Sequence, residues 1–326
     1  MLVLLMHTTR QVLVDSPKSS FCFSFFSFGG AGVDFFFVLS GFIIAYSSLG
    51  LLKQRHYGRY ISNRIIRIYP VYWIIFFLFL LPHIFFPAAY KTTYPLTLQS
   101  LLSALLLLPG HNMINGVSWT LSYELYFYLL FIVIFFFNNI KLNLVFMALY
   151  SAAIFIFFFS SGEGLLFLSP MILEFFMGIV AFLLLNQGYT RYGKPFLIVG
   201  GLLFLLSAVL VYKNLINENT EMDRVLYFGL PCFFIVYGSA VIDRKHQSTI
   251  AAPLLLIGDA SYSLYLLHLP LVIVFLKVAA RFGGLNGAFA NISCIVVVGF
   301  IIWLATIFHK RVEKPLLKKL KNTLKF

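Results

Sequence analysis

Ionisable residues inside apolar stretches are the first candidates for chemistry in this sequence, because a charge in an apolar environment is costly and is usually kept for function. His7 follows the apolar run MLVLLM, and Asp34 stands in GVDFFFVLSGF. Glu124 stands in WTLSYELYFY, and His268 stands in SYSLYLLHLP. Each of these four side chains is a candidate acid, base or hydrogen-bonding group.

His7 is a candidate general base, because an imidazole titrates close to neutral pH. It would remove a proton from a hydroxyl group or carry an acyl group as a covalent intermediate. Asp34 is a candidate partner, since a carboxylate can fix the tautomer of a histidine and stabilise its protonated ring, as in a catalytic triad. The alternative is structural: His7 then lies at the end of a helix and bonds a backbone carbonyl group.

Arg64 and Arg67 lie three residues apart in RYISNRIIRIYPVYW, so a helix would carry both on one face. Two guanidinium groups at the mouth of a helical bundle are suited to a multiply phosphorylated ligand. The tyrosines and the tryptophan that follow are typical of a membrane interface. The alternative is that the two arginines only set the topology and contact lipid head groups.

Glu124 has Trp119 before it and Tyr128 one helical turn after it. This spacing predicts either a substrate-binding network of hydrogen bonds or a buried carboxylate that neighbouring hydroxyl groups satisfy. Two further carboxylates, Glu174 and Asp259, lie close to expected helix ends. There we expect contact with water or a capping role.

The elements that position these residues must be membrane helices. Of the 326 residues, 61% are hydrophobic and 11% are charged, whereas a soluble domain is about 25% charged. The net charge of +13 comes from basic residues clustered between apolar runs, which indicates the positive-inside rule and not a nucleic-acid partner. The three cysteines lie far apart in apolar surroundings, so neither a disulfide framework nor a metal site is predicted.

The sequence predicts an all-α fold, a polytopic transmembrane helical bundle with about ten spans, the first of them truncated. Runs of about 20 apolar residues, enough to cross a bilayer, occur at 31–50, 68–87, 120–138, 142–160, 165–186, 195–213, 224–242, 254–277 and 287–309. The run 97–110 is short and ends in Pro-Gly, so we expect a re-entrant or interfacial segment. The distribution of basic residues places both termini in the cytoplasm. Residues 1–326 then form one integral-membrane domain, in which 310–326 is a basic tail on anionic lipid.

Several motifs, taken in order, resemble the membrane-bound acyltransferase 3 family, which acylates sugars and other hydroxyl acceptors. They are the apolar run that ends at His7, GVDFFFVLSGFII (32–44), RYISNRIIRIYPVYW (59–73), SWTLSYELYFY (118–128), GDASYSLYLLHLP (258–270) and VEKP (312–315). The resemblance covers essentially the whole chain. The stretch SWTLSYELYFYLLF is also similar to members that O-acetylate exopolysaccharide or capsule.

The resemblance implies roles at single positions. The histidine that closes the family's first helix corresponds to His7, the catalytic base, and the aspartate of the G-V-D-x-F-F motif corresponds to Asp34, its partner. The R-x-x-R motif corresponds to Arg64 and Arg67, which would handle the acyl-CoA donor. The W-x-L-x-x-E-x-x-F-Y motif, with a substrate-site or structural role, corresponds to Trp119, Glu124, Phe127 and Tyr128.

We therefore expect an O-acyltransferase of the bacterial inner membrane that moves an acetyl group from acetyl-CoA to a hydroxyl of a surface polysaccharide or its lipid-linked precursor. Acetyl-CoA is then a co-substrate, and no bound cofactor or metal is expected. One alternative is a transporter of an acyl group or a glycan intermediate, although no internal symmetry of two halves supports it. Another is an inactive, truncated family member, because the family usually has a longer segment before the histidine. The sequence carries no sign of the oligomeric state.

Overall fold

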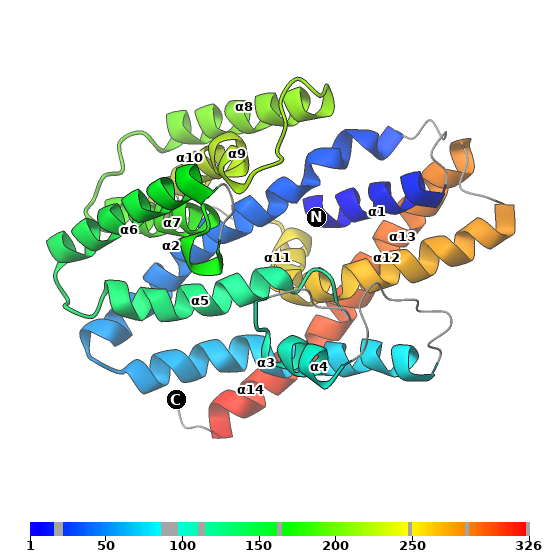
Figure 1. The fold of residues 1–326 in the computed structure, drawn as a ribbon, viewed down its shortest axis with the longest axis horizontal. Helices are drawn as coiled ribbons and strands as arrows, with labels where there is room; N and C mark the ends of the chain where they lie inside the picture. Colours follow the sequence, from blue (N-terminus) through cyan, green and yellow to red (C-terminus); the bar gives the residue numbers. More distant parts are fainter. Residues whose placement is uncertain are drawn as a thin grey trace. The chain divides into compact units, whose positions relative to one another are not determined.

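A computed structural model describes residues 1–15, 22–85, 97–109, 115–161, 165–246, 250–283 and 287–323. All regular elements within these residues are helices (Figure 1), which confirms the predicted all-α class. The chain divides into two compact units. Unit 1 comprises Met1–Gly29, Ser62–Ser122 and Ile250–Phe326, and unit 2 comprises Gly30–Ile61 and Tyr123–Thr249.

Among the described residues, seven helical segments are long and apolar enough to cross a membrane, as in a multi-pass membrane protein. They are Ser24–Lys53, Tyr57–Leu81, Ile140–Ser161, Gly193–Tyr212, Glu221–Lys245, Ser261–Ala279 and Phe289–Thr323. Two shorter apolar helices, α5 (Trp119–Ile134) and α7 (Met171–Asn186), have 16 residues each. They are about 24 Å long, against about 30 Å for the bilayer core. The total of about ten spans and the side of each terminus stay predictions.

The span expected at 254–277 begins too early, because the structure breaks this run into two helices and only the second is long enough to cross a membrane. The first is α11 (Ala252–Asp259), and after Ala260 the second, α12 (Ser261–Gly283), begins. Gly258 and Asp259 are poor helix formers, which explains the break in an otherwise apolar run. The run expected not to cross forms α4 (Leu98–Leu106), whose nine residues span only about 14 Å.

Two further expected spans begin at other residues. The helix expected from 68 is α3 (Tyr57–Phe85), which begins before both arginines of the R-x-x-R motif and therefore carries them. Its buried face continues through Tyr60, which is 0% exposed. The span expected from 165 is α7, which begins only at Met171 after a short 3₁₀ turn, η2 (Leu166–Leu168).

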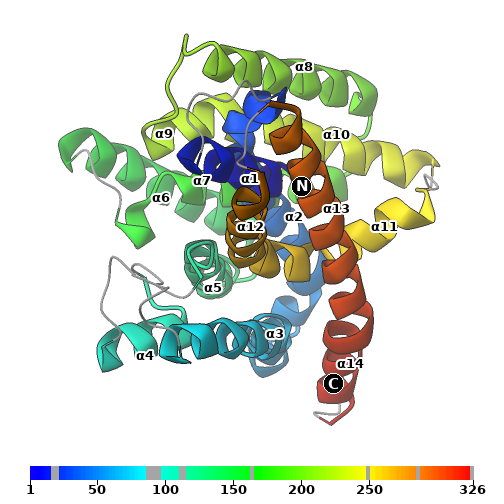
Figure 2. The ribbon, with the colours of Figure 1, turned by 90° about the vertical axis from the view of Figure 1, so that its right-hand side faces the viewer.

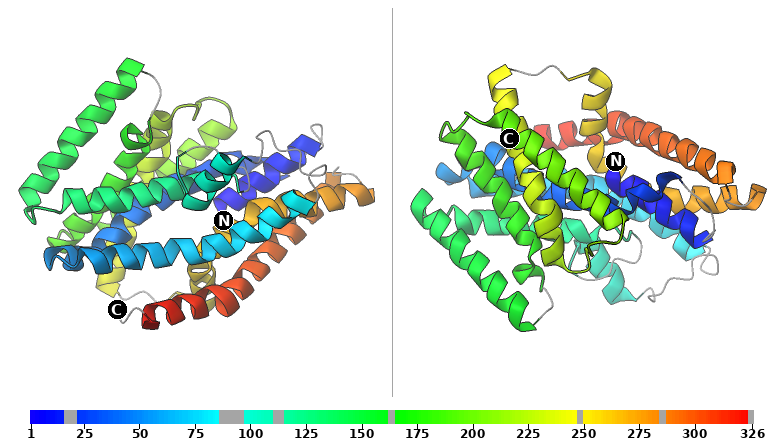
Figure 3. Two further views of the ribbon diagram at one scale, coloured as in Figure 1. Left: turned by 60° about the horizontal axis from the view of Figure 1, so that its bottom comes forward. Right: turned by 90° about the horizontal axis from the view of Figure 1, so that it is seen from above.

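In unit 1, α1 (Leu2–Asp15) packs against α12 and α13 (Gly287–Phe308), which also pack against each other (Figure 2). α13 continues through a π-helical turn, η4 (His309–Glu313), into the basic amphipathic α14 (Lys314–Thr323), as Figure 3 shows. In this turn the Glu313 carboxylate accepts a hydrogen bond from Ser263 of α12 and lies 3.0 Å from His309 Nδ1. The beginning of the predicted tail is thereby held against α12. Residues 324–326 of that tail lie outside the described residues.

In unit 2, α2 (Ala31–Lys53) and α7 cross at very close range. A Cβ atom on Gly41 would lie 2.1 Å from the carbonyl oxygen of Phe175, and a Cβ atom on Gly178 would lie 2.0 Å from that of Val38. Small residues allow such close approach of membrane helices, whose association depends on packing because lipid is as apolar as the side chains. The crossing brings the N-terminal half of α2 beside the first turn of α7.

Aromatic side chains fill the centre of unit 2. Phe127 of α5 stacks on Phe175 of α7 with ring centroids 4.3 Å apart, and it meets Phe37 of α2 edge to face at 5.3 Å. All three rings are 0% exposed. α8 (Gly193–Tyr212) packs along α10 (Leu230–His246) in the same unit (Figure 1).

Candidate functional site

His7 lies in the middle of α1, whereas the sequence analysis expected it at the end of a helix. The helix continues for about two more turns. The hydroxyl groups of Thr8 and Thr9 donate to carbonyl oxygens one turn back, at 2.8 and 2.9 Å, and so do not draw the backbone out of the helix. The structural alternative of a helix-end histidine is therefore wrong.

The ring of His7 lies against the ring of His268, and both belong to unit 1. Their centroids are 5.3 Å apart and their planes are inclined by 46°. His268 is 1% exposed, and its Nδ1 atom lies 2.6 Å from the carbonyl oxygen of Tyr265. Since a carbonyl oxygen only accepts, Nδ1 carries the proton and donates. A neutral ring then has its lone pair on Nε2, and this buried atom has no hydrogen-bond partner in the described part of the chain.

Pro270 shapes the part of α12 that carries this histidine. A proline has no N–H group, so the carbonyl oxygen of Leu266 loses its usual helical donor. Asn115 Nδ2 donates to this oxygen at 3.0 Å. The hydroxyl of Tyr265 donates to the carbonyl oxygen of Val117 at 2.7 Å. These bonds tie the segment before α5 to α12 and fix the turn on which the histidine lies.

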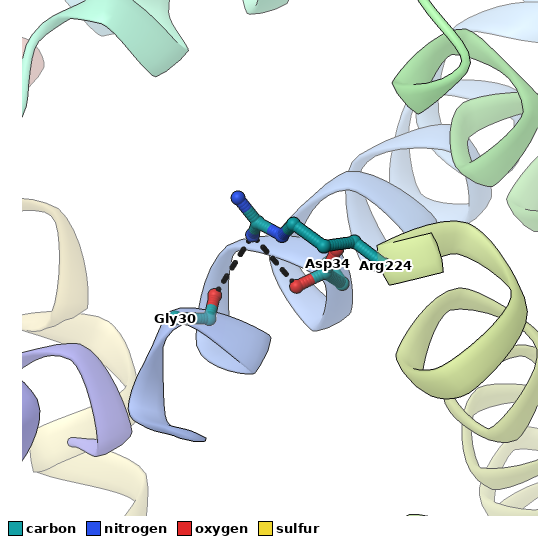
Figure 4. Close-up of polar contacts among 3 residues, drawn as sticks. All are labelled: Gly30, Asp34 and Arg224. Atoms are coloured by element: carbon teal, nitrogen blue, oxygen red, sulfur yellow. Dashed lines mark hydrogen bonds and ion pairs between the residues drawn. The ribbon is translucent and has the colours of Figure 1, made fainter. Parts of the chain in front are cut away.

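Asp34 forms an ion pair inside unit 2. It lies in the first turn of α2 and is 0% exposed. Arg224 donates from Nη2 to Asp34 Oδ2 at 2.8 Å and to the carbonyl oxygen of Gly30 at 3.1 Å (Figure 4). The sequence analysis missed Arg224, because 190 residues separate it from Asp34 and no local pattern joins them. The available signal was that a buried aspartate requires a cation.

A change of helix type places Arg224. It ends the short helix α9 (Glu221–Arg224), which passes directly into a π-helical turn, η3 (Val225–Gly229). Such turns occur frequently at functional sites. Gly229 at the end of this turn makes room for Glu174, since a Cβ atom there would lie 2.6 Å from Glu174 Oε1.

Glu174 contradicts the expectation that water reaches it. It lies in the first turn of α7, but it is 0% exposed because the close crossing with α2 covers this end of the helix. Its charged neighbours include Asp34 and Arg224. Within the described residues, no donor reaches either carboxylate oxygen of Glu174 or Oδ1 of Asp34. Two carboxyl groups beside one guanidinium leave an excess negative charge, and a proton on one of them removes this excess and supplies a donor.

The structure places His7 in unit 1 and Asp34 in unit 2. Asp34 has Arg224 as its ion-pair partner. The predicted pairing of His7 with Asp34 stays a prediction.

Arg64 and Arg67 lie on α3 in different surroundings. Arg64 is 9% exposed, whereas Arg67 is exposed. Three residues correspond to about 300° of rotation, so the two side chains point about 60° apart around the helix. This angle is enough for the Arg64 side chain to be buried while the Arg67 side chain is exposed. The two arginines therefore do not share one environment, contrary to the expectation from the sequence.

A hydrogen bond links Glu124 and Tyr128 across one turn of α5. The Tyr128 hydroxyl donates to the Glu124 carboxylate, and the two residues are 4% and 5% exposed, respectively. The carbonyl oxygen of Tyr128 accepts a hydrogen bond from the Tyr60 hydroxyl at 3.0 Å, which joins α5 to α3. This geometry matches a buried carboxylate satisfied by a neighbouring hydroxyl. Trp119 is half-buried at the start of α5, in the part of the helix that belongs to unit 1.

Glu221 is the centre of a second polar network in unit 2 that the sequence analysis missed. Its carboxylate accepts hydrogen bonds from the Tyr123 hydroxyl at 3.2 Å and from the Ser169 hydroxyl at 2.5 Å. Ser169 Oγ also accepts from the backbone N–H of Met171 at 3.2 Å. The network links α5, the beginning of α7 and α9, and so it supports the helix that carries Arg224.

These helices and buried polar groups define a multi-pass membrane protein with ionisable side chains held inside each unit. The chain matches the profile of a family described as an acyltransferase domain over residues 1–308. It is 30% identical over 313 residues to the exopolysaccharide production protein ExoZ of Rhizobium meliloti (strain 1021). The aligned region covers 90% of this chain and 91% of that protein. The chain belongs to this acyltransferase family, as its motifs predicted. No solved structure matches it.

Proposed function

We propose that this protein transfers an acetyl group from acetyl-CoA to a hydroxyl group of a cell-surface polysaccharide or its lipid-linked precursor. Membership of the family supports acyl transfer, and the name of the relative supports a glycan acceptor. The structural observation that carries the proposal is the ring of His7 held against His268, because O-acyl transfer needs a base for the acceptor hydroxyl. The proposed location is the bacterial inner membrane, with both termini in the cytoplasm.

His7 acts as the base in the proposed reaction. It accepts the proton of the acceptor hydroxyl while the hydroxyl oxygen forms a bond to the thioester carbonyl carbon of acetyl-CoA. When the tetrahedral adduct collapses, the C–S bond breaks, and the protonated His7 gives its proton to the thiolate sulfur. The products are the acetyl ester and free CoA. In the alternative two-step route, the acetyl group is first transferred to His7. With acetyl-CoA labelled in its acetyl group, this route leaves label on the protein during turnover.

Arg64 and Arg67 are proposed to bind the phosphate groups of the donor. A guanidinium group suits phosphate because it donates two parallel hydrogen bonds. The distribution of basic residues predicts a cytoplasmic position for both arginines, on the side where acetyl-CoA is found. Arg67 is exposed and is the proposed first contact, whereas Arg64 is buried and would hold a phosphate already bound.

Asp34 is proposed, from its motif, as the residue whose negative charge stabilises the protonated His7. Arg224 balances part of this charge in the structure, and Asp34→Asn should lower the turnover rate. A normal rate in Asp34→Asn would exclude the role of this carboxylate.

The experiment is a CoA-release assay on the purified protein in nanodiscs. Acetyl-CoA is supplied together with polysaccharide from the producing cells that mild alkali has de-acetylated, and the free thiol is measured. We expect release that depends on the polysaccharide, and His7→Gln should lower its rate by about 10²-fold or more. His56→Gln, at an exposed residue before α3, is the matched control and should keep the wild-type rate.

The same assay separates acyl transfer from the transporter alternative. A transporter moves its cargo without breaking the thioester, so it releases no CoA. Absence of polysaccharide-dependent CoA release from folded wild-type protein would therefore contradict the proposed function.

A further inference from the structure

His268 has a buried acceptor atom that lacks a donor. Its Nδ1 proton is engaged by the carbonyl oxygen of Tyr265 at 2.6 Å, which leaves the lone pair on Nε2. No donor within the described residues reaches Nε2, and the residue is 1% exposed. Buried polar atoms are normally satisfied, above all in a membrane protein, where lipid supplies no partner. This atom is therefore placed to receive a hydrogen bond.

The group beside this acceptor is the ring of His7. α1 packs against α12, and the two ring centroids are 5.3 Å apart. This distance is close to two imidazole ring radii plus one hydrogen bond of about 3 Å. At this separation, a His7 nitrogen that points at Nε2 of His268 makes a hydrogen bond of normal length. A neutral His7 has one N–H donor to give and one lone pair to keep.

We propose that His268 is a positioning residue for His7, and this inference rests on the proposed function. Its Nε2 atom accepts the ring N–H of His7 and thereby fixes the tautomer whose other nitrogen is the free base. A carboxylate has this role in a catalytic triad, whereas here a neutral ring anchored by a backbone carbonyl supplies the acceptor. A restrained rotation also keeps the basic nitrogen of His7 in one direction.

The proton balance assigns His268 no net transfer. The free nitrogen of His7 takes the proton of the acceptor hydroxyl as the C–O bond forms, and it returns that proton to sulfur after the C–S bond breaks. While His7 carries the positive charge, its hydrogen bond to His268 becomes charge-assisted and stronger. His268 therefore favours the charged intermediate state of His7 without gaining or losing a proton.

Two substitutions of similar size test this role. His268→Gln places an amide oxygen close to the position of Nε2, whereas His268→Asn places its amide close to Nδ1 and keeps only the bond to the Tyr265 carbonyl. In the CoA-release assay we expect Gln to retain most of the wild-type kcat. We expect Asn to lower kcat by about 10²-fold with an unchanged KM for acetyl-CoA. His56→Asn is the matched control, because it makes the same replacement at an exposed histidine before α3 and should leave kcat unchanged.

The outcomes separate this inference from the proposed function. A wild-type kcat in His268→Asn, or an equal loss of kcat in both folded variants, would overturn the role of His268. If His7→Gln is also fully active, the proposed function fails as well. If a variant does not fold, ¹⁵N NMR of the histidine-labelled wild-type protein decides the question. A neutral His268 with its proton on Nδ1 and a hydrogen-bonded Nε2 supports the proposal, and a proton on Nε2 overturns it.

Discussion

The ion pair between Arg224 and Asp34 is the basis of a prediction about stability. Arg224→Met keeps a long, apolar side chain but removes the guanidinium. In the wild-type protein the paired atoms are 2.8 Å apart, and the side chains of Arg224 and Asp34 are 17% and 0% exposed. The variant leaves Asp34 and its neighbour Glu174 buried without this cation.

The expected loss follows from the burial of the pair. Removing one partner of a buried ion pair costs about 3–5 kcal/mol, because the remaining charge is left without its partner. The partial exposure of Arg224 places the loss at the lower end, about 3 kcal/mol. For a compact unit of this size, that loss lowers the melting temperature on the order of 10 °C. Asp34→Asn combined with Arg224→Met should recover much of it, because replacing both charges leaves no unpaired ion.

Thermal unfolding in nanodiscs measures this prediction on the wild type, the two single variants and the double variant. The double variant should melt above Arg224→Met, which is a coupling between the two substitutions. Two results would refute the reasoning. One is an Arg224→Met variant that melts with the wild type, and the other is a double variant whose loss equals the sum of the single losses.

Three further predictions concern the packing and the charges. Gly178→Ala should cost about 1–3 kcal/mol and lower the melting temperature, because its methyl group would lie 2.0 Å from a backbone oxygen. The control is Gly201→Ala, which should melt with the wild type because nothing lies within 4 Å of the added methyl group. Glu174→Gln should keep the wild-type melting temperature at neutral pH, since an amide supplies the donor that a protonated carboxyl supplies; a large fall would indicate an ionised Glu174. Arg64→Ala and Arg67→Ala should each raise the KM for acetyl-CoA about tenfold, as expected for one lost hydrogen bond to a charged group. An unaltered KM would mean that the substituted arginine serves only the membrane topology.

The fold class followed from the sequence, whereas some helix bounds did not. An excess of apolar residues in runs of about 20 reports directly on helices in lipid. The mean hydropathy of such a run does not reveal a local break. Gly258 and Asp259 therefore divide one expected span into α11 and α12 without a signal in the apolar pattern. The mean hydropathy also does not reveal that a helix extends into a basic segment, as α3 does when it buries Tyr60 and Arg64.

The candidate site divides in the same way. A local hydrogen bond such as that from Tyr128 to Glu124 follows from helical spacing, because both residues lie on one face of one helix. The partner of Asp34 does not follow, since Arg224 comes from a helix 190 residues away. The burial of Glu174 depends on how closely α2 and α7 cross. The pattern within each helix does not predict this distance.

The most direct test of acetyl transfer uses membrane vesicles of the cells that make the polysaccharide, which is the proposed acceptor. Acetyl-CoA labelled in its acetyl group is added, and the label on polysaccharide that mild alkali releases is counted. The wild-type protein should give such label, and folded His7→Gln should give it at least about 10²-fold more slowly. Undiminished labelling by His7→Gln, or no alkali-labile label with the wild type, would contradict the proposed acetyl transfer.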